Sequence, residues 1–236
     1  MGSVRPRRAS RGFTLLELVV VLALIAIVAS VMVPLGFGAL REGHQARADA
    51  DLQQLATALT RFHADLRRLP SCPGPSCGAI IAAGSAANNG LRFLAVGEGR
   101  GNLAGQYPED SPALGTGWNL AGHADPGRPA RNNAFNHLVR NDPNADGVVD
   151  AQDYPRAGRA WNGPYLATLG LDPWGHAYVI SVGAVELGGR PISPGAQAWV
   201  LSAGPNGILE TTPDAVVLGG DDRGFIFAPP VSVAAR

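Results

Sequence analysis

Oxygen-bearing side chains recur between Asp142 and Asp153 at a spacing that suits a metal ion. They occupy positions 1, 3, 5, 9 and 12 of this segment, and Gly147 occupies position 6. An EF-hand-type loop wraps Ca²⁺ in this order, with a backbone carbonyl at position 7. The ligands expected from the pattern are Asp142, Asn144, Asp146, the Val148 carbonyl, Asp150 and Asp153. The alternative is an Asn/Asp/Gly-rich surface turn, which uses the same residue types without an ion.

The sequence contains no recognisable catalytic pattern. Its histidines belong to neither a nucleophile elbow nor an H-E-x-x-H motif; they are His44, His63, His123, His137 and His176. The carboxylates gather in segments that suit calcium better than acid–base chemistry. The chain is therefore not expected to be an enzyme. A membrane-tethered calcium-dependent binding module or hydrolase, with a catalytic pair assembled across the fold, stays an alternative.

A single carboxylate, Glu17, stands at the start of an apolar run. From Leu18 to Leu40 the sequence has no charged residue, and a helix of this length can cross the ~30 Å hydrocarbon core of a membrane. A lone carboxylate in a membrane costs roughly 2.5–3.5 kcal/mol at the helix centre and less near an interface. Glu17 therefore needs a partner.

The charges on either side of the apolar run differ. Four arginines precede it without any acid, namely Arg5, Arg7, Arg8 and Arg11. Basic residues beside a membrane span stay in the cytoplasm, so the bulk of the chain is expected outside. The formal net charge is zero, and beyond residue 12 the acids exceed the bases by about four. Nucleic-acid binding, which needs a basic surface, is not expected.

The segment Arg11-Gly12-Phe13-Thr14-Leu15-Leu16-Glu17 resembles the processing site of type IV pilins and of the pseudopilins of type II secretion systems. The resemblance implies that a prepilin peptidase cuts between Gly12 and Phe13 and methylates Phe13. The new ammonium of Phe13 can then neutralise Glu17 of a neighbouring subunit during assembly. An ordinary signal peptide cut near residues 28–30 and a plain membrane anchor are the alternatives, and both leave Glu17 unexplained.

The C-terminal third resembles the major pseudopilin of type II secretion. Two motifs look like that family, Gly163-Pro164-Tyr165-Leu166 and Asp172-Pro173-Trp174-Gly175 followed by Tyr178. A later stretch resembles the same family's C-terminal calcium loop, and the implied ligands are Ser202, Asn206, Asp221 and Asp222. This sequence departs from the family at two points: Asn206 stands where Asp is commoner, and the spacer 208–218 is long.

Cys72 and Cys77 are the only cysteines, with Pro-Gly-Pro-Ser between them. In an exported chain such a pair predicts a local disulfide. The chain-entropy model gives so short a loop about 2 kcal/mol of stabilisation. The alternative is a metal site, of which two cysteines supply only half.

Helical and strand patterns place these sites. Six apolar residues recur at steps of three and four and predict one face of a helix; they are Leu52, Leu55, Leu59, Phe62, Leu66 and Leu69. One helix from Phe13 to Leu69, kinked near Pro34 and stopped by Pro70, is expected. A short helix is expected within 134–140. Strands are expected at 176–182, 198–202 and 224–228, forming an antiparallel sheet that the helix covers on one face.

The resemblance and these patterns together predict an α+β pilin fold. Its parts are a basic leader (1–12), a transmembrane and assembly helix (13–35), an amphipathic helix (36–69) and a periplasmic globular domain (70–236). The resemblance implies a structural subunit of a type II secretion pseudopilus, or else of a type IV pilus or competence pilus. The implied partners are other pseudopilin subunits, the prepilin peptidase, the inner-membrane platform with its assembly ATPase, and the membrane. Calcium is the expected cofactor.

Overall fold

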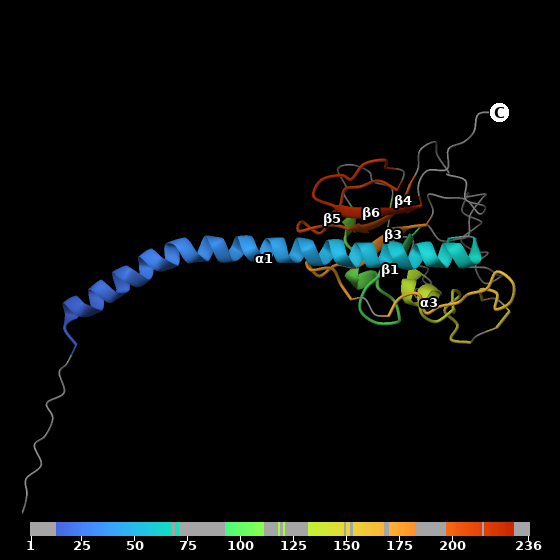
Figure 1. The fold of residues 1–236 in the computed structure, drawn as a ribbon, viewed down its shortest axis with the longest axis horizontal. Coiled ribbons are helices and arrows are strands. Elements are labelled where there is room, and N and C mark those ends of the chain that lie inside the picture. Colours follow the sequence, from blue (N-terminus) through green and yellow to red (C-terminus); the bar gives the residue numbers. More distant parts are fainter. Residues whose placement is uncertain are drawn as a thin grey trace, which may run out of the picture. The chain divides into compact units, whose positions relative to one another are not determined.

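The computed structural model describes residues 13–67, 69–70, 93–110, 118, 120, 132–148, 150–151, 153–167, 170–182, 197–213 and 215–228. The chain divides into two units, Met1–Gly43 and His44–Arg236. A single helix of 52 residues, α1 (Leu15–Leu66), begins in the first unit and ends in the second (Figure 1). Gly12, Cys72 and Cys77 lie outside the described residues.

In the first unit α1 continues past Pro34 without interruption. Its large apolar side chains are exposed on every side, as shown by Leu18, Ile25 and Leu35 at 56%, 58% and 69% exposure. A helix that is apolar all round is typical of a segment that lies in lipid or among other helices.

In the second unit α1 is amphipathic, as its spacing predicted. All six residues of the apolar stripe are buried, from Leu52 to Leu69. The helix ends at Leu66 and not at Leu69, because Arg67 adopts a left-handed conformation with φ 55°. The Arg67 amide still donates to the His63 carbonyl at 2.8 Å, which closes the last turn.

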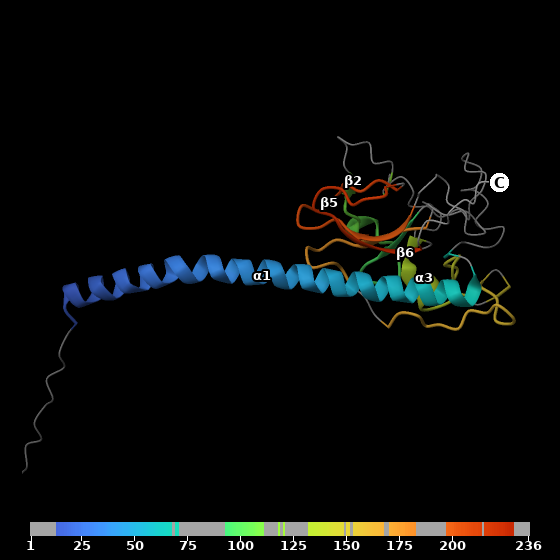
Figure 2. The same cartoon turned by 45° about the horizontal axis from the view of Figure 1, so that its top comes forward.

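Four antiparallel strands form the main sheet in the order β1-β3-β4-β6 (Figures 1 and 2). They are β1 (Phe93–Val96), β3 (Tyr178–Ser181), β4 (Ala198–Ser202) and β6 (Arg223–Ala228). The expected strands at 176–182, 198–202 and 224–228 are confirmed. The sequence did not predict β1, because its four residues are all buried and show no alternation of apolar and polar side chains.

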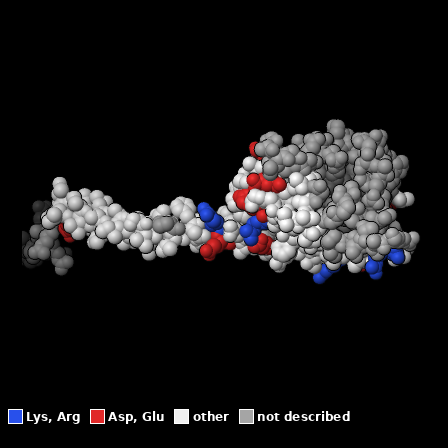
Figure 3. Space-filling model, turned by 90° about the horizontal axis from the view of Figure 1, so that it is seen from above, with Lys and Arg blue, Asp and Glu red and all other residues white. Residues whose placement is uncertain are grey.

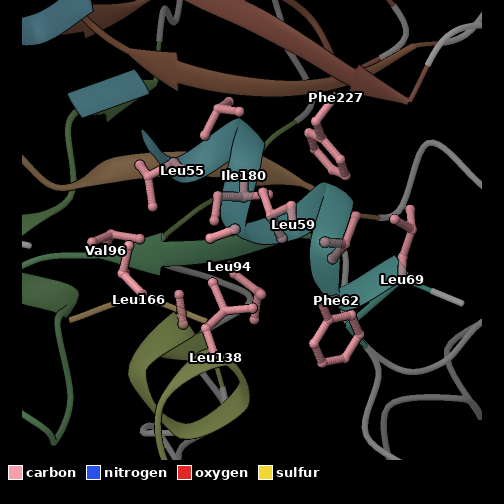
Figure 4. Packing of buried hydrophobic residues seen from close by; sticks show 14 of the residues in the cluster. Leu55, Leu59, Phe62, Leu69, Leu94, Val96, Leu138, Leu166, Ile180 and Phe227 are labelled. Atoms are coloured by element: carbon pink, nitrogen blue, oxygen red, sulfur yellow. The ribbon is translucent and has the colours of Figure 1, made fainter. Parts of the chain in front are cut away.

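Both faces of this sheet are buried, and not only the face beneath the helix. On one face Leu94 and Ile180 pack with Leu55, Leu59 and Phe62 of α1 (Figure 4). The opposite face carries a second cluster that includes Phe93, Val179, Trp199 and Leu201, covered by Leu103, Trp118, Leu120 and Leu209. The helix therefore covers one face as expected, and the second apolar layer on the other face was not predicted from the sequence.

Short elements complete the described structure. They are η2 (Ala104–Gln106), β2 (Glu109–Asp110), α3 (Ala134–Leu138) and β5 (Ile208–Leu209). The helix expected within 134–140 is confirmed as α3. Asn133 is its N-cap, and its Oδ1 accepts the Phe135 amide at 3.0 Å. Strands β2 and β5 pair in parallel beside the loop that carries Asn206. The whole is an α+β arrangement of a long N-terminal helix and a small antiparallel sheet.

Candidate functional site

The first turn of α1 is capped by the residues that the processing motif contains. Thr14 Oγ1 accepts a hydrogen bond from the Glu17 amide at 3.2 Å. The spacing of Thr14 and Glu17 is that of a capping box, in which an acid three residues after the cap stabilises the helix start. Phe13, which would become the N-terminus after cleavage, is 80% exposed. The bond uses the backbone amide of Glu17, so it caps the helix without the carboxylate that is expected to act in assembly.

The apolar part of α1 is long and apolar enough to cross a membrane, by length and composition. None of its most apolar stretch is buried, and in Figure 3 the described atoms along it are almost all uncharged. A signal sequence near the N-terminus can have the same length and apolar composition. Glu17 and the motif around it therefore distinguish a pilin-type helix from a signal sequence.

The loop from Asp142 to Asp153 is wrapped around its own acidic side chains. Asp142 is buried, and its two carboxylate oxygens accept the amides of Asp146 and Gly147, each at 3.1 Å. Asn144 Oδ1 also accepts the Asp146 amide, at 3.2 Å, and Asp146 Oδ1 accepts the Val148 amide at 2.8 Å. Gly147 has a φ of 81°, which explains a glycine at this turn.

The end of the loop returns to its beginning through Asp153. Its Oδ2 accepts the Asp150 amide at 2.7 Å, whereas Oδ1 is buried and has no hydrogen-bond partner. Burial raises the pKa of Asp153, and the neighbouring carboxylates of Asp142, Asp150 and Asp146 raise it further against the opposing hydrogen bond from the Asp150 amide. The Asp153 side chain thus closes the end of the loop on the Asp150 backbone.

The acidic side chains of this loop do not form a ready-made metal site. Among the described residues, no three side chains of Asp, Glu, His or Cys lie in a group that could hold a metal ion. An EF-type shell also uses amide and carbonyl oxygens, which here are Asn144 and the Val148 carbonyl. The loop arrangement is therefore compatible with both readings of its sequence, an ion-binding loop and a polar turn.

The C-terminal loop brings together three of its four expected residues. The Asn206 amide donates to Asp221 Oδ2 at 3.3 Å. Asp222 is buried, and its Oδ2 accepts the amides of Glu210 and Thr211 at 2.9 and 2.6 Å. As in the other loop, the second oxygen of the buried acid, Asp222 Oδ1, has no hydrogen-bond partner.

The structure adds Glu210, which the sequence analysis left inside the long spacer. Its Oε2 accepts the Asp221 amide at 3.1 Å and lies 3.4 Å from Asn206 Nδ2. The Glu210 carboxylate lies so close to Gly220 that any side chain at that position would collide with it. Burial raises the pKa of Asp222 to about 6, with the Glu210 charge acting in the same direction against hydrogen bonds from Thr211 and Glu210. In the sequence, the only signal for Glu210 was that a single acid stands near the start of the spacer 208–218.

Ser202 is engaged elsewhere through its side chain. Its hydroxyl donates to Asp172 Oδ2 at 2.6 Å, and Asp172 Oδ1 accepts the amides of Trp174 and His176 at 3.0 and 2.8 Å. Asp172 also receives the Gly175 amide on its carbonyl at 3.1 Å, which confirms the predicted turn. Ser202, at the end of β4, therefore holds the Asp-Pro-Trp-Gly turn through Asp172.

The comparisons with known proteins concern the N-terminus. No curated protein and no solved structure matches the chain. Residues 7–33 match the family described as "Prokaryotic N-terminal methylation motif". The motif implies processing by a prepilin peptidase and assembly with other subunits. Over this segment the match supports the resemblance to type IV pilin-like proteins, which are structural subunits of a pilus or pseudopilus.

Proposed function

We propose that the protein is a structural subunit of the pseudopilus of a type II secretion system. The match to the methylation motif supports a pilin-like subunit without distinguishing pseudopilus from pilus. The single observation that carries the filament part of the proposal is the exposed apolar half of α1 with Glu17 at its start. Such a helix needs lipid before assembly and the helices of other subunits afterwards.

The aromatic motifs support the pseudopilus through their resemblance to the major pseudopilin, and two of their tyrosines bond to α1. Tyr165 donates to Asp65 Oδ2 at 2.9 Å, and Tyr178 donates to Asp51 Oδ2 at 2.8 Å. Both acids lie on α1 and both tyrosines lie in the segments that resemble the major pseudopilin. The motif residues thus act in fold stability, which agrees with a structural subunit.

We also propose that the C-terminal loop binds one Ca²⁺. The residues that fit the ion are Asn206, Asp221 and Asp222, with Glu210 as an additional acid. The unpartnered Asp222 Oδ1 supports this, because a buried carboxylate oxygen without a partner costs stability unless a cation satisfies it. Oxygen ligands of this kind suit Ca²⁺. The ion would tie the loop between β5 and β6.

The processing step is tested by intact mass. The full chain is produced in cells with and without a prepilin peptidase, extracted from membranes and weighed. We expect a chain that begins at N-methylated Phe13 only when the peptidase is present. A start near Val31 would indicate an ordinary signal peptide, and an unprocessed chain in both cases would indicate a plain anchor.

The choice between pseudopilus and pilus is tested by deleting the gene in its natural host. We expect loss of folded enzymes from the culture medium, with their accumulation in the periplasm. Unchanged secretion together with the loss of surface filaments or of DNA uptake would assign the subunit to a pilus or competence system.

A further inference from the structure

We propose that the loop between Asp142 and Asp153 is a second calcium site, separate from the C-terminal loop and independent of the filament assignment. The proposed ligands are Asp142, Asn144, Asp146 and Asp153, with the carbonyl of Val148 and one oxygen of Asp150 or water completing the shell.

The first argument is the orphaned oxygen at the end of the loop. Asp153 is only 7% exposed, and its Oδ1 has no hydrogen-bond partner. A buried carboxylate oxygen without a donor loses its hydration without compensation. The charged groups that act on this carboxylate are the acids of the same loop, Asp142, Asp150 and Asp146. A cation at Asp153 Oδ1 would supply the missing partner, and the other acids of the loop would have to close on it, since no three of these described side chains form such a group as they stand.

The second argument is that the hydrogen bonds of the loop leave lone pairs on its carboxylate oxygens. A carboxylate has about four lone-pair sites on its two oxygens. Each oxygen of Asp142 accepts one amide, so each retains a lone pair, and the same is true of Asp146 Oδ1. The amides fix the direction of these oxygens. Calcium tolerates such a shell because its coordination is flexible at six to eight oxygens, whereas Mg²⁺ demands near-octahedral geometry.

The third argument is charge. The segment 142–153 contains four aspartates and no basic residue. Asp142 and Asn144 are buried at 2% and 0% exposure, so water screens their surroundings poorly. Zn²⁺ is a poor fit because the segment offers neither histidine nor cysteine. A divalent ion with oxygen ligands relieves the repulsion directly.

The loop is joined to the core, so an ion in it should be felt by the whole unit. Its two ends are clamped together, since Asn141 Oδ1 accepts the Tyr154 amide at 3.1 Å and Asn141 Nδ2 donates to the Tyr154 carbonyl at 3.2 Å. The Tyr154 ring stacks edge-on against Phe62 of α1, with centroids 5.0 Å apart. Ordering Asp153 therefore orders the residue that packs against the helix.

The test counts calcium ions bound to the full chain in detergent, after removal of metal with EGTA and equilibrium dialysis against radioactive calcium. Two variants disrupt the loop: Asp146→Ala removes an exposed ligand, and Asp153→Asn removes the charge but keeps an oxygen for the Asp150 amide. Glu98→Gln, at an exposed acid outside both loops, is the matched control. We expect both loop variants to bind one ion fewer than wild type and the control to bind as many. Unchanged stoichiometry in both loop variants would overturn the proposal.

Asp222→Asn separates this site from the C-terminal one. In that variant we expect one ion to remain, and this ion should disappear when Asp146→Ala is added. If Asp222→Asn binds as many ions as wild type while Asp146→Ala binds one fewer, the C-terminal proposal fails and the 142–153 site stands. In the Asp222→Asn chain, calcium should still raise the unfolding temperature relative to EGTA. A chain with this single substitution that folds and binds no calcium would overturn the 142–153 site.

Discussion

Arg223, the first residue of β6, forms a two-pronged ion pair with Asp49 of α1. Its Nε lies 2.8 Å from Asp49 Oδ1 and its Nη2 lies 2.6 Å from Oδ2. Arg223 is the residue after Asp222 of the C-terminal loop. The same chain segment therefore contacts α1 and contributes to the candidate calcium site. The paired carboxylate raises the pKa of the Arg223 guanidinium, which therefore stays charged.

Asp49→Asn should lower the free energy of unfolding by about 1 kcal/mol, because the pair is two-pronged but only partly buried. The measurement is a double-mutant cycle with Arg223→Gln, in which the free energy of unfolding of each full chain is obtained by denaturant unfolding in detergent. A coupling free energy near zero would show that the contact contributes nothing to stability.

Leu59→Ala should destabilise the His44–Arg236 unit by about 2–5 kcal/mol, since Leu59 is fully buried between the helix and the sheet. Leu22→Ala is the matched control, because Leu22 lies on the same helix but is 57% exposed. The control should leave the unfolding of this unit unchanged. Equal losses of stability in the two variants would contradict the described packing.

The sequence predicted the elements whose residues follow a clear period. The stripe around Leu59 has helical spacing, and the strands β3, β4 and β6 lie where they were expected. It missed β1, because a strand buried on both faces lacks alternation. It also missed the second apolar layer, since no periodic pattern in the sequence marks residues such as Trp118 and Leu120 as part of it.

The candidate sites divide in the same way. The acids of the 142–153 loop are neighbours in sequence, so their spacing alone indicated a site. Glu210 joins Asp221 only because β5 and β6 fold their connecting segment back on itself. The contact between Asp49 and Arg223 joins residues 174 positions apart. No local pattern marks such pairs.

Glu17→Gln should leave membrane insertion intact and impair assembly. Thr14 Oγ1 accepts the backbone amide of residue 17, which glutamine and valine both retain, so either variant keeps the helix cap. Both substitutions remove the charge that would pair with the Phe13 ammonium of a neighbouring subunit, and valine removes the polar side chain as well. In-membrane crosslinking measures assembly, and carbonate extraction measures insertion. Crosslinked ladders of equal length in wild type and both variants would exclude the ammonium pairing.

Cys72 and Cys77 should be bonded to each other in the exported protein. The measurement is thiol labelling after denaturation without reductant, with a reduced sample as the positive control. Two labelled thiols in the protein from the periplasmic side would contradict the disulfide. If the bond forms, reduction should cost about 2 kcal/mol of stability by the chain-entropy estimate.

The last prediction concerns the C-terminal loop. Chelation should lower the unfolding temperature of the full chain, since an ion that binds only the folded state stabilises it by roughly 2.7 kcal/mol at a hundredfold excess over its dissociation constant. Asp222→Asn and Glu210→Gln should both reduce this response to chelator. Asp222 also accepts the amides of Glu210 and Thr211, so a lower unfolding temperature by itself would reflect only those hydrogen bonds.

The informative quantity is therefore the difference between the unfolding temperatures in calcium and in EGTA. A purely structural Asp222 would lower both temperatures equally in the Asn variant and leave that difference as large as in wild type. An ion ligand would shrink the difference, because the variant loses the stabilisation that calcium adds. Glu98→Gln, at an exposed acid outside both loops, should keep the full difference. If Asp222→Asn and Glu210→Gln also keep it, the carboxylates of this loop hold the chain through backbone amides alone, and the response to calcium comes from elsewhere.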